Sequence, residues 1–232
     1  MRSLSVVLFA LLAGIGMVDT AMAAGGADVL QQQCSSCHAL TKPADASLDR
    51  LWERKGPDLY YAGVKFNREW LEAWLQNPTT IRPGGVMYAK VVKASADKTA
   101  DTIDASKLTA HIKLNKADAG AAADALMKLG TDLDLVQKGA FKNGAPGPMA
   151  KMLFSKLRGC SSCHSAKEGS GGQSGPELAD AGSRLQPDFM VAYINNPQKF
   201  DPHIWMPTLG LTDADVQKLT GYLITLKTAE AK

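Results

Sequence analysis

The sequence contains one pentapeptide twice, Cys-Ser-Ser-Cys-His, and the two copies together use every cysteine in the chain. The first copy spans residues 34–38 and the second spans residues 160–164. Because a repeated motif can mark a repeated structural unit, the segments that follow the two copies are compared first. The motif constrains the fold strongly, since each half must hold two cysteines and a histidine in the same local arrangement.

Residues downstream of each pentapeptide correspond to one another at a constant offset of 119 positions. The matching pairs are Gly56-Pro57 with Gly175-Pro176, Gly63 with Gly182, Trp70 with Phe189, Trp74 with Tyr193, Asn77-Pro78 with Asn196-Pro197, and Met87 with Met206. So many matches at a single offset indicate that a unit was duplicated. Near the end of each half the offset falls to 97. The first half therefore holds an insertion of about 22 residues, at about residues 88–113.

The duplication predicts two tandem domains behind an export signal. Residues 1–23 combine a positively charged start, an apolar run and an Ala-Met-Ala site, which is typical of a signal peptide cut after Ala23. The apolar run is shorter than the ~20 residues that cross a bilayer, which disfavours an uncleaved anchor. The export signal, together with the motifs described below, suggests that the protein lies in a bacterial periplasm. We expect domain one at residues 24–138, a Gly- and Pro-rich linker at 139–149 and domain two at 147–232.

The predicted secondary structure is helical throughout, so the expected fold class is all-α. No segment alternates between apolar and polar residues over the length of a strand, so sheets should be absent or minor. Asn115 and Thr212 are the expected N-caps of the closing helices, and each Asn-Pro ends a central helix. The insertion is expected to be a surface loop with some helix. The expected helices lie at residues 27–33, 67–76, 116–129, 150–157, 187–195 and 213–227.

Four kinds of chemistry compete for the pentapeptide. A thioredoxin-like dithiol usually lies in a βαβ context, which this sequence lacks. A zinc site, or the disulfides that an oxidising compartment permits, would leave the histidines unexplained. Cys-x-x-Cys-His is instead the signature of covalent haem c attachment, in which the cysteines form thioethers with the porphyrin and the histidine binds iron. We expect two haem c groups, attached through Cys34, Cys37, Cys160 and Cys163, with His38 and His164 as iron ligands.

Each iron needs a sixth ligand or an open face, and two methionines are the best candidates. Met87 and Met206 lie nine residues after the proline of each Asn-Pro, in loops that contain proline. Other methionines have no counterpart in the repeat and suit core packing. Thioether ligation would raise the reduction potential and close the distal face of the haem. Two histidines are rival ligands: His203, which corresponds to Gly84, and His111, which lies in the insertion.

The order of these motifs resembles that of class I cytochromes c. CSSCH, Gly-Pro, a helix ending in Asn-Pro, a loop with methionine and a C-terminal helix follow one another twice, over nearly the whole mature chain. The resemblance implies two all-α cytochrome c folds, as in the dihaem cytochromes of bacterial respiratory chains. By position it assigns Cys34, Cys37, His38 and Met87 to haem one and Cys160, Cys163, His164 and Met206 to haem two. The first half departs from the pattern in its insertion and in lacking a proline after Met87.

The expected function is electron transfer between periplasmic redox partners, such as a dehydrogenase and a terminal oxidase. The formal net charge is only +3 and no arginine-rich stripe is present, so nucleic acid is a poor candidate partner. Membrane association is expected only through a partner complex. No catalytic residue is evident. The alternative is a dihaem enzyme, a peroxidase or a sulfur-compound dehydrogenase, which requires an open or displaceable ligand at one haem.

Overall fold

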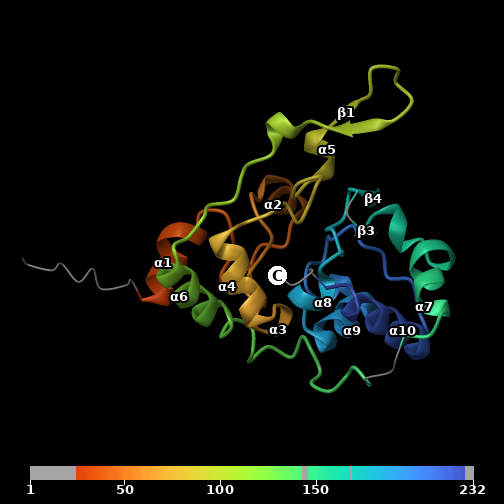
Figure 1. Cartoon of the computed structure of the whole chain (residues 1–232). Coiled ribbons are helices and arrows are strands. Elements are labelled where there is room, and N and C mark those ends of the chain that lie inside the picture. The colour runs from red at the N-terminus through yellow and green to blue at the C-terminus, as the bar shows by residue number, and fades with distance from the viewer. Residues whose placement is uncertain (1–24, 143–145, 168, 228–232) are drawn as a thin grey trace, which may run out of the picture.

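The computed structural model describes residues 25–142, 146–167 and 169–227, and in these residues regular structure is mainly helical (Figure 1). The predicted signal peptide and residues 143–145 of the predicted linker lie outside the described residues. Among the described residues, no helix is both long enough and apolar enough to cross a membrane.

The first half is built from five helical segments apart from the insertion. They are α1 (Gly26–Val29), which continues as a π-helix (Leu30–Cys34), α2 (Leu48–Glu53), α3 (Ala62–Lys65), α4 (Arg68–Gln76) and α6 (Lys116–Leu126). Helix α1 crosses α6 at close range, because Gly26 has no side chain and a Cβ there would run into the carbonyl of Ala121. Helix α4 packs on the same helix, so α6 forms the centre of this half.

The insertion differs from the predicted loop with some helix, because it contains a β-ribbon. A short helix, α5 (Tyr88–Val91), leads into β1 (Val92–Ala94), which pairs antiparallel with β2 (Asp101–Ile103), and a 3₁₀ turn (Ala105–Lys107) follows. Valine, threonine and isoleucine in these strands favour extended backbone, which composition alone did not reveal. The ribbon projects from the rest of the molecule (Figure 1). The two short ribbons described here agree with the expectation of minor sheet content.

The second half repeats the order of α1, α3, α4 and α6, without a counterpart of α2 and without the long insertion. Its elements are α7 (Met149–Met152), a π-helix (Leu153–Leu157), a 3₁₀ turn (Cys160–Ser162), the ribbon β3 (Ser165–Lys167) and β4 (Ser170–Gly171), α8 (Ala181–Arg184), α9 (Pro187–Asn195), a 3₁₀ turn (Pro197–Lys199) and α10 (Asp213–Ile224). Helix α9 begins and ends at the predicted residues, since proline suits the first helical position and Asn-Pro ends the helix.

The closing helices of the two halves begin at the predicted caps and end at equivalent contacts. Asn115 and Thr212 each accept a backbone hydrogen bond with the side chain, as N-caps do. Both helices end three residues earlier than predicted. Just beyond these ends, the carbonyl of Leu129 accepts from the N–H of Gly63 at 2.9 Å, and the corresponding bond joins Leu226 and Gly182 at 2.7 Å.

Equivalent residues of the two halves meet in a reciprocal backbone contact. Phe66 and Leu185, which differ by the repeat offset, form an isolated antiparallel bridge. The N–H of Asn67 donates to the carbonyl of Arg184 at 2.8 Å, and the N–H of Gln186 donates to the carbonyl of Lys65 at 2.9 Å. Since 67 corresponds to 186 and 65 to 184, each half makes the same contact to the other.

Side chains repeat this reciprocity around the bridge. The amide of Asn67 donates to the carbonyls of Ser183 and Leu185 at 2.8 and 3.3 Å. Its counterpart Gln186 donates to the carbonyls of Gly63 and Phe66 at 2.9 and 2.7 Å. One hydrophobic core, which includes residues of both halves, surrounds these contacts.

Two cation–π contacts between the halves are reciprocal in the same way. The Lys65 ammonium lies 5.8 Å from the Phe189 ring centroid, and the Arg184 guanidinium lies 5.8 Å from that of Trp70. Lysine 65 corresponds to arginine 184, and Trp70 corresponds to Phe189. The halves are therefore held together by contacts with the local symmetry of an isologous interface.

The described part of the predicted linker is fastened to the second half. The carboxylate of Asp188 in α9 accepts from the N–H groups of Gly139 and Phe141 at 2.7 and 2.9 Å. Gln217 in α10 accepts from the N–H of Lys142 and donates to a neighbouring carbonyl. Residues 139–142 therefore follow the surface of the second half.

The contacts between the halves predict that two glutamine substitutions lower the free energy of unfolding by different amounts. Gln186→Ala removes two hydrogen bonds that cross between the halves, so we expect the free energy of unfolding to fall by about 1–3 kcal/mol. Gln76→Ala, the matched control, removes a hydrogen bond to Glu72 within one helix and should change stability by less than about 0.5 kcal/mol. Urea unfolding followed by circular dichroism measures both. Equal midpoints for the two variants would contradict this account of the interface.

Candidate functional site: the two CSSCH motifs

Both pentapeptides fold into the same hydrogen-bonded turn. In the first, the N–H groups of Cys37 and His38 donate to the carbonyl of Cys34 at 3.1 and 3.0 Å. In the second, Cys163 and His164 donate to the carbonyl of residue 160 at 3.2 and 3.0 Å. The turn places the two cysteines and the histidine of each motif within one short segment of backbone.

Each histidine is fixed by the Gly-Pro pair that follows its motif. The Nδ1 atom of His38 lies 2.7 Å from the carbonyl oxygen of Pro57, and that of His164 lies 2.8 Å from the carbonyl oxygen of Pro176. A carbonyl can only accept, so Nδ1 carries the proton and Nε2 keeps a free lone pair. This is the tautomer that a metal-binding histidine needs, with the second nitrogen held by a backbone carbonyl.

The glycine of each Gly-Pro pair gives the imidazole its space. A Cβ at Gly56 would lie 2.5 Å from Cε1 of His38, and a Cβ at Gly175 would lie 2.6 Å from Cε1 of His164. Any larger residue would therefore displace the ring from its carbonyl partner. This close approach explains why a glycine precedes the proline in both halves, a contact that the sequence analysis did not predict.

Burial keeps both imidazoles neutral. It lowers the pKa of His38, and the nearby His111 acts in the same direction. Burial also lowers the pKa of His164, and the positive charges of Arg82 and Arg184 add to the effect. The hydrogen bonds to the proline carbonyls act against these shifts in both cases. A neutral imidazole is the form that binds iron.

The four cysteines are free thiols, which excludes structural disulfides in this structure. Burial raises the pKa of Cys34 and of Cys160, so both favour the thiol form. In the described part of the chain, no three side chains of His, Cys, Asp or Glu gather as a site for a bare metal ion. Zinc is therefore a poor fit to the donors present. Two thiols and one carbonyl-bound imidazole per turn fit a covalently attached haem c.

A cluster of cations between the halves also suits an anionic cofactor. Arg54 pairs with Asp201 at 2.7 Å and with Asp58 at 3.6 Å, yet its buried Nε has no hydrogen-bond partner. Burial and the neighbouring cations Arg82 and Arg184 lower the pKa of Lys65 to about 7. No carboxylate of the described residues pairs with Lys65 or Arg82. Carboxylates such as haem propionates would supply the missing partners.

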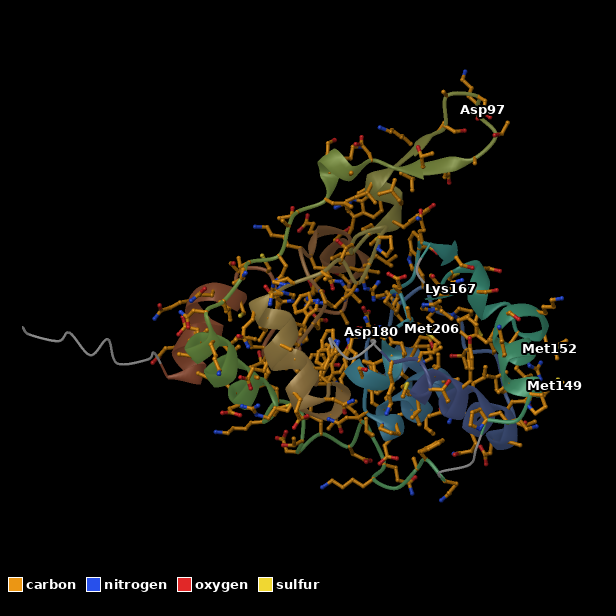
Figure 2. The ribbon with its side chains drawn as sticks, in the orientation of Figure 1. Asp97, Met149, Met152, Lys167, Asp180 and Met206 are labelled. Carbon is orange, nitrogen blue, oxygen red and sulfur yellow. The ribbon has the colours of Figure 1, made fainter. Side chains whose placement is uncertain are left out.

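Met206 lies in a loop that a single glutamine holds in place. The side chain of Gln198 donates to the carbonyl of Met206 at 2.8 Å and accepts from the hydroxyl of Thr208 at 2.6 Å. Figure 2 shows Met206 toward the middle of the molecule, whereas Met149 and Met152 lie at its outer edge. Those two are about half exposed, so the core-packing role expected for methionines without a repeat counterpart is wrong for them.

Met87 is buried at the boundary between the halves. It lines a cavity of about 40 Å³ together with Arg54 and Arg82 of its own half and with Ser174, His203 and Trp205 of the other. The loop before it is tied to the second half, because Gly84 donates to the carbonyl of Gln173 at 3.0 Å.

The rival histidines lie in different surroundings. His203 belongs to the cavity that Met87 lines. His111 instead lies beside the first motif, with its ring centroid 6.1 Å from that of His38. It also contacts Trp74, at 4.6 Å between centroids. The structure therefore places this histidine of the insertion beside the first motif. In the sequence analysis, His111 was only a rival to Met87.

The aromatic residues form two clusters, one in each half. Phe66, Trp70 and Trp74 form a stack with centroid separations of 5.9 and 5.7 Å, and it continues to His111. In the second half Phe189 contacts Tyr193 at 5.2 Å, and it also stacks on Tyr61 of the first half at 6.1 Å. The indole of Trp70 donates to Asp180 across the interface at 3.0 Å. The ring contacts beside the first motif are thus connected to the second half by the hydrogen bond between Trp70 and Asp180.

A comparison with known families matches the part of the chain that contains the second motif. Residues 149–227 match the family model for cytochrome c. This stretch contains the second CSSCH motif, Gly175-Pro176, Met206 and α10. The match supports a cytochrome c with covalently bound haem and a role in electron transfer. No curated protein and no solved structure matches the chain at a significant level.

The role of the glycine that lies against each histidine can be tested by comparing its substitution with the substitution of a glycine elsewhere in the chain. Gly175→Ala should displace His164 from Pro176, lower stability by about 1–3 kcal/mol and reduce covalent haem at the second motif. Gly120→Ala is the control, because its Cβ would meet nothing closer than 3.6 Å in α6 and should be neutral or stabilising by up to about 1 kcal/mol. Intact-protein mass spectrometry and urea unfolding report both effects. Full haem attachment and unchanged stability in Gly175→Ala would contradict the proposed packing.

Proposed function

We propose that the chain is a dihaem c-type cytochrome that carries electrons between periplasmic redox proteins. The observation that carries this proposal is the pair of equivalent motifs, in which each histidine is held through Nδ1 by a proline carbonyl. The cytochrome c family match over residues 149–227 supports the same reading of the second half. The duplicated motif, the repeat offset and the reciprocal contacts extend it to the first half.

In this proposal the cysteines and histidines have fixed roles. Cys34 and Cys37, and likewise Cys160 and Cys163, attach one haem c each through thioethers. His38 and His164 present Nε2 to the iron, while the proline carbonyls keep the rings oriented and the proton on Nδ1. The haem, when bound, supplies a one-electron iron couple.

Met206 is the proposed sixth ligand in the second half, and sequence position makes Met87 the corresponding candidate in the first. Gln198 holds the Met206 loop by its backbone, so the thioether can be presented without rearrangement of the loop. A thioether ligand favours ferrous iron and fills the position at which a small substrate would bind. Both effects suit a carrier, which only gains and loses electrons.

The interface between the halves suits electron exchange within one molecule. The reciprocal bridge fixes the two motifs relative to one another, and buried cations between them stabilise negative charge that the cofactors would bring. A donor protein and an acceptor protein, each of the redox class, complete the pathway. We place the protein in the periplasm, where the predicted export signal would send it.

The alternative is a dihaem enzyme with a displaceable ligand in the first half. One observation favours it: Met87 lines a cavity together with Ser174, His203 and Trp205 of the second half. Exposure of the purified protein to cyanide and peroxide separates the two functions. An unchanged low-spin spectrum supports a carrier, whereas ligand binding at one haem supports the enzyme.

Met206 provides the direct test of the carrier proposal. Haem content should be two per chain, and Met206→Ala should abolish the near-infrared Fe–S(Met) band of the second haem and lower its reduction potential. Met152→Ala is the control, because this exposed methionine lies on α7. Optical spectra with potentiometric titration measure these changes. A protein without covalent haem would refute the function, and an unchanged band in Met206→Ala would refute the ligand.

A further inference from the structure

We propose that His111, rather than Met87, is the sixth iron ligand in the first half, which makes the first site bis-histidine. The inference rests on the proposed haem function and adds the identity of one ligand. It also gives the insertion a purpose, since this segment carries the histidine to the first motif.

The separation of the two imidazoles agrees with a shared metal ion. The centroids of His38 and His111 lie 6.1 Å apart, with the ring planes at 47°. Two imidazoles that bind one metal from opposite sides, with metal–nitrogen distances near 2.0 Å, have centroids on the order of 6 Å apart. The His111 ring also lies against Trp74, at 4.6 Å between centroids with the ring planes tilted by 59°.

Both histidines have the same nitrogen occupied by a backbone carbonyl. Nδ1 of His38 is bonded to Pro57 O at 2.7 Å, and Nδ1 of His111 is bonded to Ile112 O at 2.8 Å. Because each carbonyl accepts a hydrogen bond from Nδ1–H, Nδ1 is occupied in both rings and Nε2 is the nitrogen left for a metal. Two neutral imidazoles with free Nε2 atoms are the donor pair that a bis-histidine site requires.

The backbone around His111 is anchored, so its position is defined by more than one contact. Leu114 is buried, and its N–H donates to the carbonyl of Leu75 in α4 at 2.9 Å. Asn115 caps α6 one residue later. The imidazole itself lies against Trp74 of the same helix α4. These contacts fix a short segment between two helices of the first half, next to the motif.

Position along the chain supports the same assignment when it is counted from the closing helix. His111 lies five residues before α6 begins at Lys116, and Met206 lies seven residues before α10 begins at Asp213. Met87 lies 29 residues before α6. The insertion therefore separates Met87 from the closing helix but leaves His111 within two residues of the place that Met206 occupies in the second half.

The second half has no equivalent of the pair of histidines formed by His38 and His111. In the described residues, His164 has no aromatic ring contact, and position 208, which corresponds to His111 at the offset of 97, is threonine. The two sites would consequently differ in ligand type. Bis-histidine ligation gives a lower reduction potential than His/Met ligation, so electrons would favour passage from the first site to the second.

The test compares ligand variants in the full, haem-loaded protein. His111→Ala should convert one of the two haems to a high-spin or ligand-accessible form, and added imidazole should restore the low-spin spectrum. His111→Met should add a second Fe–S(Met) band of similar strength and raise the lower of the two potentials. His203→Ala is the matched control, since this histidine lies outside both motifs and should leave the spectrum unchanged.

The same spectra distinguish His111 from Met87 as the sixth ligand of the first haem. The wild-type band should correspond to one methionine-ligated haem, and Met87→Leu should leave that band intact. Loss of half of the band in Met87→Leu, or two unchanged low-spin haems in His111→Ala, would overturn the inference. Neither result would affect the proposed carrier function, which fails only if the chain binds no covalent haem by pyridine haemochrome analysis.

Discussion

The hydrogen bond from each motif histidine to a proline carbonyl is the interaction on which the two sites depend. It selects the tautomer, orients the ring and leaves Nε2 available, and it forms only because a glycine precedes the proline. A backbone carbonyl is a reliable acceptor, since its position is set by the chain and not by a rotamer. The Gly-Pro pair therefore acts on the chemistry of a residue 19 positions away in the first half and 12 positions away in the second.

Much of the helical structure could be predicted because its signals are local. Proline at the first position and Asn-Pro at the end define α9 to the residue, and Asn115 and Thr212 mark the starts of the closing helices. The π-helical turns before the motifs have no recognisable sequence signal. The β-ribbon was missed because three-residue strands are too short to show alternation.

The grouping of two cysteines and a histidine in each motif could also be predicted, since it depends on spacing within five residues, and their role in haem attachment stays a prediction. The remaining ligands depend on contacts between distant segments, which the repeat offset describes only in part. Counting forward from Asn-Pro selects Met87, whereas counting back from the closing helix selects His111. The choice requires the structure, because an insertion between two landmarks makes the two counts disagree.

The reciprocal contact between the halves has a consequence for how the two sites can change. In a symmetric homodimer every substitution appears on both sides of the axis at once. Here the two partners are encoded separately, and they already differ: Asn67 in the first half corresponds to Gln186 in the second, and Trp70 corresponds to Phe189. The contact has tolerated these differences. Fusion in one chain therefore frees each half to acquire its own ligand and its own potential without loss of the shared interface.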